Sequence, residues 1–206
     1  MTPTTNHADV LIVGGGLAGL VAAKMLQAQG KSVIVLDKGR SVGGRLATRR
    51  VGAGLADHGA QFFTVRSPEF QQLVDPWIEE KLVYLWSMGW SDGSLEGVSY
   101  DGHPRYATHG GMNAIASRLA KDLKDVRVDV LIKSVRTVGT GWLIADQAGN
   151  EYTGHALVLT PPVPQSLALV AEGGVPLSEA DKAALEAIQY APCLTGIFLM
   201  AEDTPF

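Results

Sequence analysis

Two short apolar runs near the start of the chain flank a helical pattern. Val10–Val13 and Val33–Leu36 are apolar throughout rather than alternating, which is typical of strands in a parallel sheet covered on both faces. Between them, apolar residues in 17–29 recur near helical spacing, and Gly30 follows where a left-handed cap would end a helix. The pattern predicts a strand–helix–strand unit with a right-handed crossover.

Further along, helical and strand-like patterns alternate. The expected helices cover 67–85, 112–123 and 178–188, the last with Ser178 as its N-cap. The expected strands are short antiparallel ones within 84–106, a β-meander over 126–135, 142–146 and 156–160, and the start of a strand at 195–200. The segment 40–59 is rich in Gly and Arg, so we expect a loop there.

Composition narrows the class of protein. The chain has 206 residues, of which 46% are hydrophobic, so it can bury a core. Its net charge is −4 without a long run of one sign, which argues against a nucleic-acid partner. The single cysteine, Cys193, cannot form an internal disulfide and is expected to be a core thiol.

Neither a signal peptide nor a membrane span is expected. The polar start MTPTTNHAD lacks a basic stretch followed by an apolar one. The uncharged run from Val10 to Ala23 is interrupted by glycines and falls short of the roughly 20 apolar residues that a span needs. We therefore expect a soluble cytoplasmic protein that does not bind membranes.

The segment GGGLAG lies between the first predicted strand and the helix. Gly14 permits a tight turn, Gly16 lets the backbone approach a pyrophosphate, and Gly19 allows close helix–strand packing. Asp37 ends the second strand, where an acid can accept hydrogen bonds from ribose hydroxyls and would repel a 2′-phosphate. These features predict a dinucleotide site, for NAD or FAD, whose candidate contacts are Gly14, Gly16, Leu17, Ala18, Gly19, Asp37 and Lys38.

A second glycine pair with a neighbouring arginine favours FAD. Gly43, Gly44 and Arg45 can place backbone N–H groups and a guanidinium near the pyrophosphate of a long cofactor. This GGR segment resembles the second dinucleotide motif of the flavin amine oxidase superfamily. The segment ADHGAQFFT at 56–64 then resembles the D-x-G-A-Q-[FY]-F motif of the renalase-like branch.

Weaker matches to that branch follow. Gly111–Met112 resembles the pair that starts a helix, Ile132 falls where a branched residue covers the adenine, and LTPPVPQ at 159–165 resembles an A-x-P-x-P-Q turn. In that turn Thr160 stands where alanine is more usual. The resemblance extends over about 10–200.

The resemblance implies a flavin site and a substrate cavity. It places Gly59, Ala60 and Gln61 against the isoalloxazine, and it adds Gly44, Arg45 and Ile132 to the cofactor contacts. It places Phe62 and Phe63 near the substrate; for these, ordinary core packing is the alternative. Trp86, Trp90, Tyr100 and Tyr106 could line a pocket for a flat substrate, with Tyr106 the best candidate and core or inter-domain packing the alternative. No catalytic residue is assigned, His58 and His109 included, and no metal site is expected.

The predicted fold class is α/β: a Rossmann-like FAD/NAD(P)-binding parallel sheet with a β-meander, plus part of an α+β substrate domain. The FAD domain is expected from 1–66 and 107–165, and the substrate domain from 67–106 and 166–206.

The implied function is an FAD-dependent oxidoreductase that passes a hydride from a small molecule to FAD and then electrons to O2. The substrate is an amine or a misreduced nicotinamide dinucleotide. The alternatives are a non-catalytic dinucleotide-binding module or an inactive fragment, and an NAD-dependent dehydrogenase.

Proteins of this kind are longer and close with a second Gly-Asp segment that covers the flavin. On that ground we expect these 206 residues alone to bind FAD weakly or not at all.

Overall fold

The computed structural model describes residues 6–90 and 99–198. Within these ranges the chain forms two compact units. The first contains 6–44 and 116–193, and the second contains 45–90, 99–115 and 194–198. The division differs from the predicted domains: 45–66 and 107–115 belong to the second unit, and 166–193 to the first.

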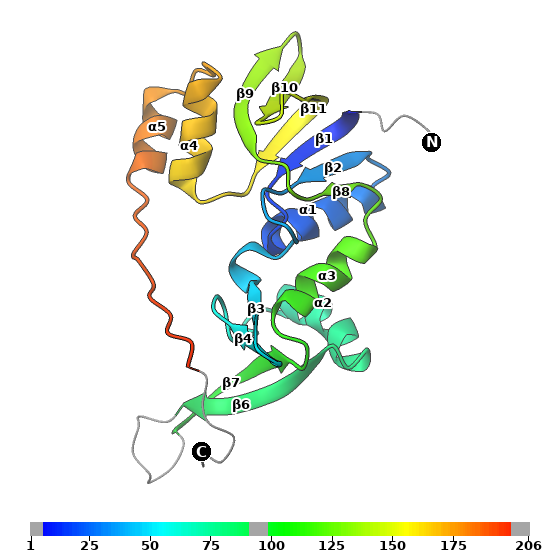
Figure 1. Cartoon of the computed structure of the whole chain (residues 1–206), viewed down its shortest axis with the longest axis vertical. Helices are drawn as coiled ribbons and strands as arrows, with labels where there is room; N and C mark the ends of the chain where they lie inside the picture. Colours follow the sequence, from blue (N-terminus) through cyan, green and yellow to red (C-terminus); the bar gives the residue numbers. More distant parts are fainter. Residues whose placement is uncertain (1–5, 91–98, 199–206) are drawn as a thin grey trace. The chain divides into compact units, whose positions relative to one another are not determined.

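The first unit is built on a six-stranded mixed sheet in the order β8-β2-β1-β11-β10-β9 (Figure 1). β1 pairs in parallel with β2 and β11, and β11, β10 and β9 form an antiparallel meander. The strands are β1 (His7–Val13), β2 (Val33–Leu36), β8 (Val126–Arg127), β9 (Ile132–Val138), β10 (Gly141–Asp146) and β11 (Glu151–Leu159). The predicted Rossmann-like sheet with its meander is confirmed.

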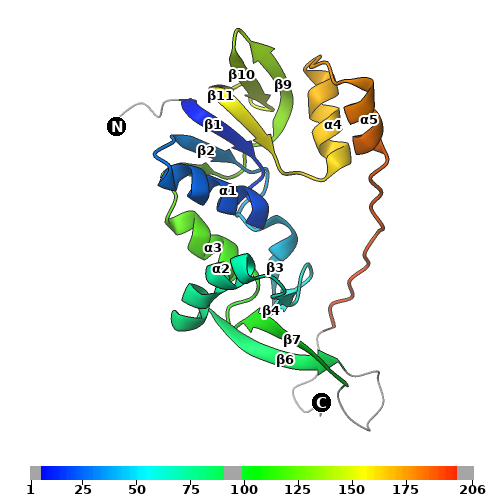
Figure 2. The same cartoon turned by 180° about the vertical axis from the view of Figure 1, so that it is seen from behind.

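Side chains of β1 are buried on both faces of this sheet, as the continuous apolar run predicts. Leu11 lies in a core cluster against which Leu169 and Val170 of α4 (Val163–Glu172) pack. On the other face Ile12 is fully buried, as are Leu20 and two further residues of α1 (Leu17–Ala28). Figure 2 shows α1 and α4 from behind.

The helical pair α4 and α5 follows β11. Sequence reasoning missed α4 because it treated the prolines of 161–164 as breakers, whereas Pro164 lies in the first turn, where no intrahelical N–H bond is lost. α5 (Glu179–Glu186) confirms the last predicted helix, and the Ser178 hydroxyl caps it by accepting a hydrogen bond from the Asp181 N–H.

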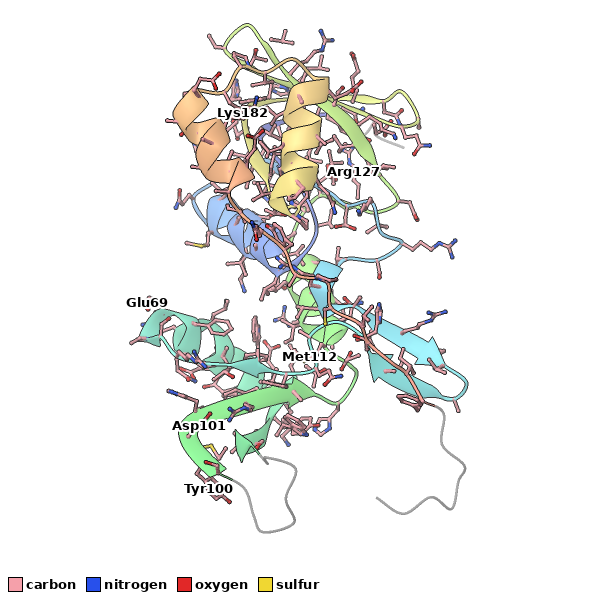
Figure 3. The ribbon with its side chains drawn as sticks, turned by 90° about the vertical axis from the view of Figure 1, so that its left-hand side faces the viewer. Glu69, Tyr100, Asp101, Met112, Arg127 and Lys182 are labelled. Atoms are coloured by element: carbon pink, nitrogen blue, oxygen red, sulfur yellow. The ribbon has the colours of Figure 1, made fainter. Side chains whose placement is uncertain are left out.

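The second unit combines two hairpins and a helix. The segment predicted as loop contains a 3-10 turn, η1 (Gly44–Leu46), and the hairpin of β3 (Thr48–Val51) and β4 (Gly54–Asp57). A three-stranded antiparallel sheet has the order β5-β7-β6, with β5 (Phe63–Thr64), β6 (Val83–Trp90) and β7 (Ser99–Thr108). Figure 3 labels Tyr100 and Asp101 on β7.

Two helices of this part of the chain start where the sequence indicates. α2 (Pro68–Glu79) has Pro68 in its first turn, but it ends well before the predicted boundary at 85 because β6 begins at Val83. α3 (Asn113–Lys121) begins directly after Gly111–Met112, and the division between the two units falls within it.

The segment 189–198 has neither helix nor strand. The strand expected at 195–200 is therefore absent over 195–198, and its last two residues lie outside the described ranges. Cys193 is exposed, so the prediction of a core thiol is wrong: the residues of 189–198 around it are exposed as well. None of the helices in the described ranges is long and apolar enough to cross a membrane.

Candidate dinucleotide site

The glycine loop joins β1 to α1 in the first unit. Gly14 has φ of +106°, a conformation that favours glycine, and its N–H donates to the Leu36 carbonyl at 2.8 Å. At Gly19 an added Cβ would overlap the Gly14 carbonyl oxygen. At Gly16 an added Cβ would meet only the Gly43 carbonyl oxygen, at 4.0 Å. Gly19 is therefore required by packing, whereas Gly16 leaves open space.

The N-terminus of α1 has no side-chain cap in the described parts of the chain. Gly16 is the N-cap residue, and no acidic residue lies in the first turn. The first N–H groups of a helix have no intrahelical partner and carry a partial positive charge. The open surface at Gly16 thus lies beside donors that suit an anion such as a pyrophosphate.

One peptide unit of the loop is held at both ends. The Gly15 N–H donates to Asp37 Oδ2 at 2.6 Å. The Thr160 hydroxyl shares its one proton between the carbonyl of the same peptide, that of Gly14, at 3.2 Å and the Val13 carbonyl at 3.0 Å. The ends of β2 and β11 therefore fix the glycine loop together.

Asp37 retains capacity for a ligand. Its Oδ1 accepts from the Gly39 N–H at 2.7 Å, so among the described residues each carboxylate oxygen has one backbone donor and a lone pair left to accept another. The side chain is half-buried at the end of β2. The neighbouring Lys38 is exposed and donates to Gln165 Oε1 at 3.3 Å.

The second glycine pair lies against the first glycine loop. The Gly43 N–H donates to the Gly15 carbonyl at 2.8 Å, and Gly16 and Gly43 form a parallel bridge. Gly44 has φ of +53°, and an added Cβ there would be 3.5 Å from Gly16 Cα. The structure thus brings together the two glycine motifs and Asp37. Arg45 belongs to the second unit.

Ile132, predicted to cover an adenine, is a core residue. It is only 5% exposed and packs in the same core cluster as Leu11. Its role toward adenine stays a prediction. Near it a cavity of about 270 Å³ is lined by Asp129, Leu131, Asp146, Gln147 and Ala148.

Asp146, in that cavity wall, is held ionised by its neighbours. Burial alone would raise the pKa of Asp146, but hydrogen bonds from the Asn150 side chain and backbone outweigh it and hold the pKa below its ordinary value. The Tyr152 hydroxyl also donates to this carboxylate, at 3.1 Å, and burial followed by this contact raises the pKa of Tyr152. This network anchors the turn between β10 and β11.

In the second unit, the segment after β4 is packed tightly on η1. The Ala60 N–H donates to the Arg45 carbonyl at 2.9 Å, and a Cβ at Gly59 would overlap that carbonyl oxygen. Gly59 is therefore needed for packing within the unit, independently of any flavin. Gln61 is exposed and Ala60 half-buried; their predicted contact with a flavin stays a prediction.

Asp57 and Thr48 cap the N-terminus of α3 from a distant hairpin. Asp57 Oδ1 accepts from the Met112 N–H at 2.9 Å and from the Thr48 hydroxyl at 2.5 Å. Thr48 Oγ1 in turn accepts from the Asn113 N–H at 3.1 Å. Figure 3 labels Met112 beside this hairpin. Sequence reasoning quoted Asp57 as part of a motif but missed this role, because Thr48 carries no local signal for it.

The aromatic side chains of the second unit form groups of ring contacts. Phe63 lies in a cluster with Tyr106, whose ring stacks on it at 5.6 Å, and with Phe70 and Trp77. Phe62 stacks on Trp86 at 5.3 Å. Phe63 and Tyr106 are half-buried and pack against other aromatic rings, and the predicted place of the phenylalanines near a substrate stays a prediction.

A cavity of about 390 Å³ in the second unit has polar and aromatic walls. Tyr84 stacks on His109 at 4.3 Å, and the hydroxyl of Thr108 is buried without a hydrogen-bond partner among the described residues. The lining residues are Ala56, Asp57, Gln61, Tyr84, Trp86, Ala107, Thr108 and 195–198. Of the four pocket candidates, Trp86 lines it and Tyr106 does not; Tyr100 is 77% exposed, and the Trp90 side chain lies outside the described ones.

Neither unit contains a group of three or more His, Cys, Asp or Glu side chains that could hold a metal ion, within residues 6–90 and 99–198.

Part of the chain is similar to a known family model and to curated amine oxidases. The family model of an NAD(P)-binding Rossmann-like domain matches residues 12–77. Putrescine oxidase of Kocuria rosea is 39% identical over 72 residues, which are 35% of this chain and 15% of that protein. Flavin-containing amine oxidase B of Homo sapiens is 48% identical over 46 residues, 22% of this chain and 9% of that protein.

Solved structures share the fold over a longer stretch. A variant of putrescine oxidase with redesigned cofactor binding superimposes with a TM-score of 0.70 at 16% identity, covering 89% of this chain and 64% of that one. Wild-type putrescine oxidase bound to putrescine gives a TM-score of 0.62 at 16% identity, covering 79% and 60%. The chain thus spans less than two thirds of these proteins.

Proposed function

We propose, from the relationship of this chain's Rossmann-like domain to that of the flavin-containing amine oxidases, that the first unit binds the ADP portion of FAD. The observation that carries the proposal is the open surface at Gly16 beside the uncapped N-terminus of α1, with Asp37 at the end of the next strand. The N–H groups of Leu17, Ala18 and Gly19 would donate hydrogen bonds to the pyrophosphate. The Asp37 carboxylate would accept hydrogen bonds from the ribose hydroxyls.

The residues present fit this ligand better than NADP. The Asp37 carboxylate would repel a 2′-phosphate, while its free lone pairs suit two hydroxyl donors. The second glycine pair, which an NAD enzyme does not need, lies in backbone contact with Gly15 and Gly16. FAD, when bound, would supply hydride acceptance and the reduction of O2 to peroxide.

We further propose that the whole protein is a renalase-like FAD-dependent oxidoreductase. The support is the motif of Asp57, Gly59, Ala60, Gln61, Phe62 and Phe63. The substrate would be a reduced small molecule, either an amine or a misreduced nicotinamide dinucleotide. The cavity lined by Gln61, Tyr84 and Trp86 is the candidate site for this substrate, because its aromatic walls suit a flat group.

Titration of the purified chain tests the cofactor first. ADP, followed by calorimetry, should bind. FAD, followed by flavin fluorescence, should bind weakly, as expected for these 206 residues alone, and NADP should bind more weakly than ADP. A chain that binds neither ADP nor FAD at millimolar concentration would refute the proposed site.

Peroxide release then tests the reaction. The flavin-loaded protein, extended by its native downstream sequence if one exists, should release peroxide with a primary amine or with a reduced dinucleotide preparation. Flavin binding without oxygen consumption for either substrate would instead favour a non-catalytic module.

A further inference from the structure

Thr160 stands at the end of β11 and touches the glycine loop with its side chain. Its backbone N–H already donates to the Val13 carbonyl at 3.0 Å, which continues the pairing of β1 and β11. An added Cβ at Gly14 would overlap the Thr160 hydroxyl oxygen. This hydroxyl lies within hydrogen-bond distance of two carbonyl oxygens, that of Val13 at 3.0 Å and that of Gly14 at 3.2 Å. No other donor reaches the Gly14 carbonyl oxygen in the described parts of the chain.

The peptide between Gly14 and Gly15 is one that could rotate. Both residues are glycines, for which opposite signs of φ are similarly accessible. In the observed orientation its N–H meets Asp37 Oδ2 at 2.6 Å and its carbonyl meets Thr160. The reverse orientation would turn the carbonyl toward the Asp37 carboxylate and leave the Thr160 hydroxyl without that acceptor.

We infer that Thr160 is a positioning residue for the dinucleotide, an inference that rests on the proposed function. Its hydroxyl holds the Gly14–Gly15 peptide in the orientation that keeps the carbonyl away from the approaching pyrophosphate. Through the same peptide it fixes the carboxylate of Asp37 for the ribose. An alanine at this position would support the same strand pairing but would not supply this restraint.

The chemistry of the side chain makes the inference testable with three variants. Thr160→Val keeps the shape and removes the hydroxyl, and Thr160→Ser keeps the hydroxyl and removes the methyl group. Thr153→Val is the matched control, because Thr153 lies on β11 and, among the described residues, its hydroxyl bonds to the exposed His7 and not to the glycine loop. All three keep the backbone of β11 and its pairing with β1.

The affinities for FAD and for ADP are measured on the whole chain. Thr160→Val should weaken both about tenfold, the effect of losing one hydrogen bond that holds the site. Thr160→Ser should stay within about twofold of the wild type, and Thr153→Val should not change either affinity. Hydrogen exchange of the Gly15 and Gly16 amides should accelerate in Thr160→Val alone.

The outcomes separate this inference from the proposed function. If Thr160→Val binds FAD and ADP as tightly as the wild type, Thr160 does not position the dinucleotide. The same holds if Thr160→Ser loses as much affinity as Thr160→Val. Either result leaves the proposed dinucleotide site unaffected. A wild-type chain that binds neither ligand overturns both.

Discussion

Replacing Gly16 by alanine tests whether the space beside this residue is needed for ligand binding or for packing of the fold. Gly16 has φ of −77° and ψ of 179°, which any residue can adopt. The added Cβ would lie 4.0 Å from its nearest neighbour, the Gly43 carbonyl oxygen, so the free energy of unfolding should change by less than about 0.5 kcal/mol.

The same methyl group would occupy the surface from which a pyrophosphate approaches the N-terminus of α1. Steric conflict of one extra methyl group in a close-packed contact costs about 1–3 kcal/mol. Dissociation constants for ADP and FAD should therefore rise about 5- to 150-fold. The expected result is a protein of normal stability that binds its dinucleotide poorly.

Gly19→Ala is the matched control, because it adds the same methyl group three residues further on. There an ideal Cβ would overlap the carbonyl oxygen of Gly14, which directly follows β1. It would also lie 3.3 Å from Ile12 Cγ2, on β1 itself. Alanine is better than glycine in a helix by about 1 kcal/mol, yet α1 must move from the sheet. We expect a net destabilisation of about 1–3 kcal/mol.

Urea unfolding and ADP titration of both variants give the answer. If Gly16→Ala loses as much stability as Gly19→Ala, the space at Gly16 is not open. If Gly16→Ala binds ADP with wild-type affinity, the phosphate does not approach there, and the reasoning about the loop fails.

Three further predictions concern the second unit. Asp57→Ala should lower the unfolding free energy by about 1–3 kcal/mol, because the Met112 N–H loses its acceptor, and an unchanged urea midpoint would contradict that role. Ser67→Ala removes the N-cap of α2 and should lower the free energy of unfolding by about 1 kcal/mol; an unchanged thermal unfolding midpoint would contradict the role of the cap. Hydrogen bonds from the Arg105 side chain and then the His103 backbone lower the pKa of Asp101, so the folded state holds this proton less readily than the unfolded chain. The resulting stability is present at neutral pH and is lost progressively as the pH falls below about 4 toward the lower folded-state pKa. The difference in urea midpoint between wild type and Asp101→Asn should shrink over that range, and a constant difference would contradict the linkage.

Much of the first unit could be predicted from local pattern. The continuous apolar runs of β1 and β2 and the glycines between them have few alternative interpretations, since burial on both faces and a tight turn are local demands. The hairpin at 48–57 could not be found in this way, because none of its strand residues is buried and the two strands are held by pairing with each other. Cys193 is expected in the core because its local sequence is apolar, whereas the residues of 189–198 are exposed, and local sequence does not reveal burial.

Some features of the candidate site could likewise be predicted from the sequence, and others could not. Gly14, Gly16, Gly19 and Asp37 were recognisable from their spacing, because a phosphate-binding turn requires those residue types at those positions. Spacing did not reveal that Gly19 is a packing requirement while Gly16 is open, since that depends on the distance between α1 and β1.

The strand–turn–helix, its glycines and the acid after the second strand all follow from local backbone preference and hydrophobic period. Which distant side chains support them depends on how the chain folds in three dimensions. Thr160 reaches the loop because β11 pairs in parallel with β1, and Thr48 reaches the start of α3 through a hairpin. Such contacts join residues far apart in the chain, and their existence depends on strand pairing and packing that no local pattern specifies.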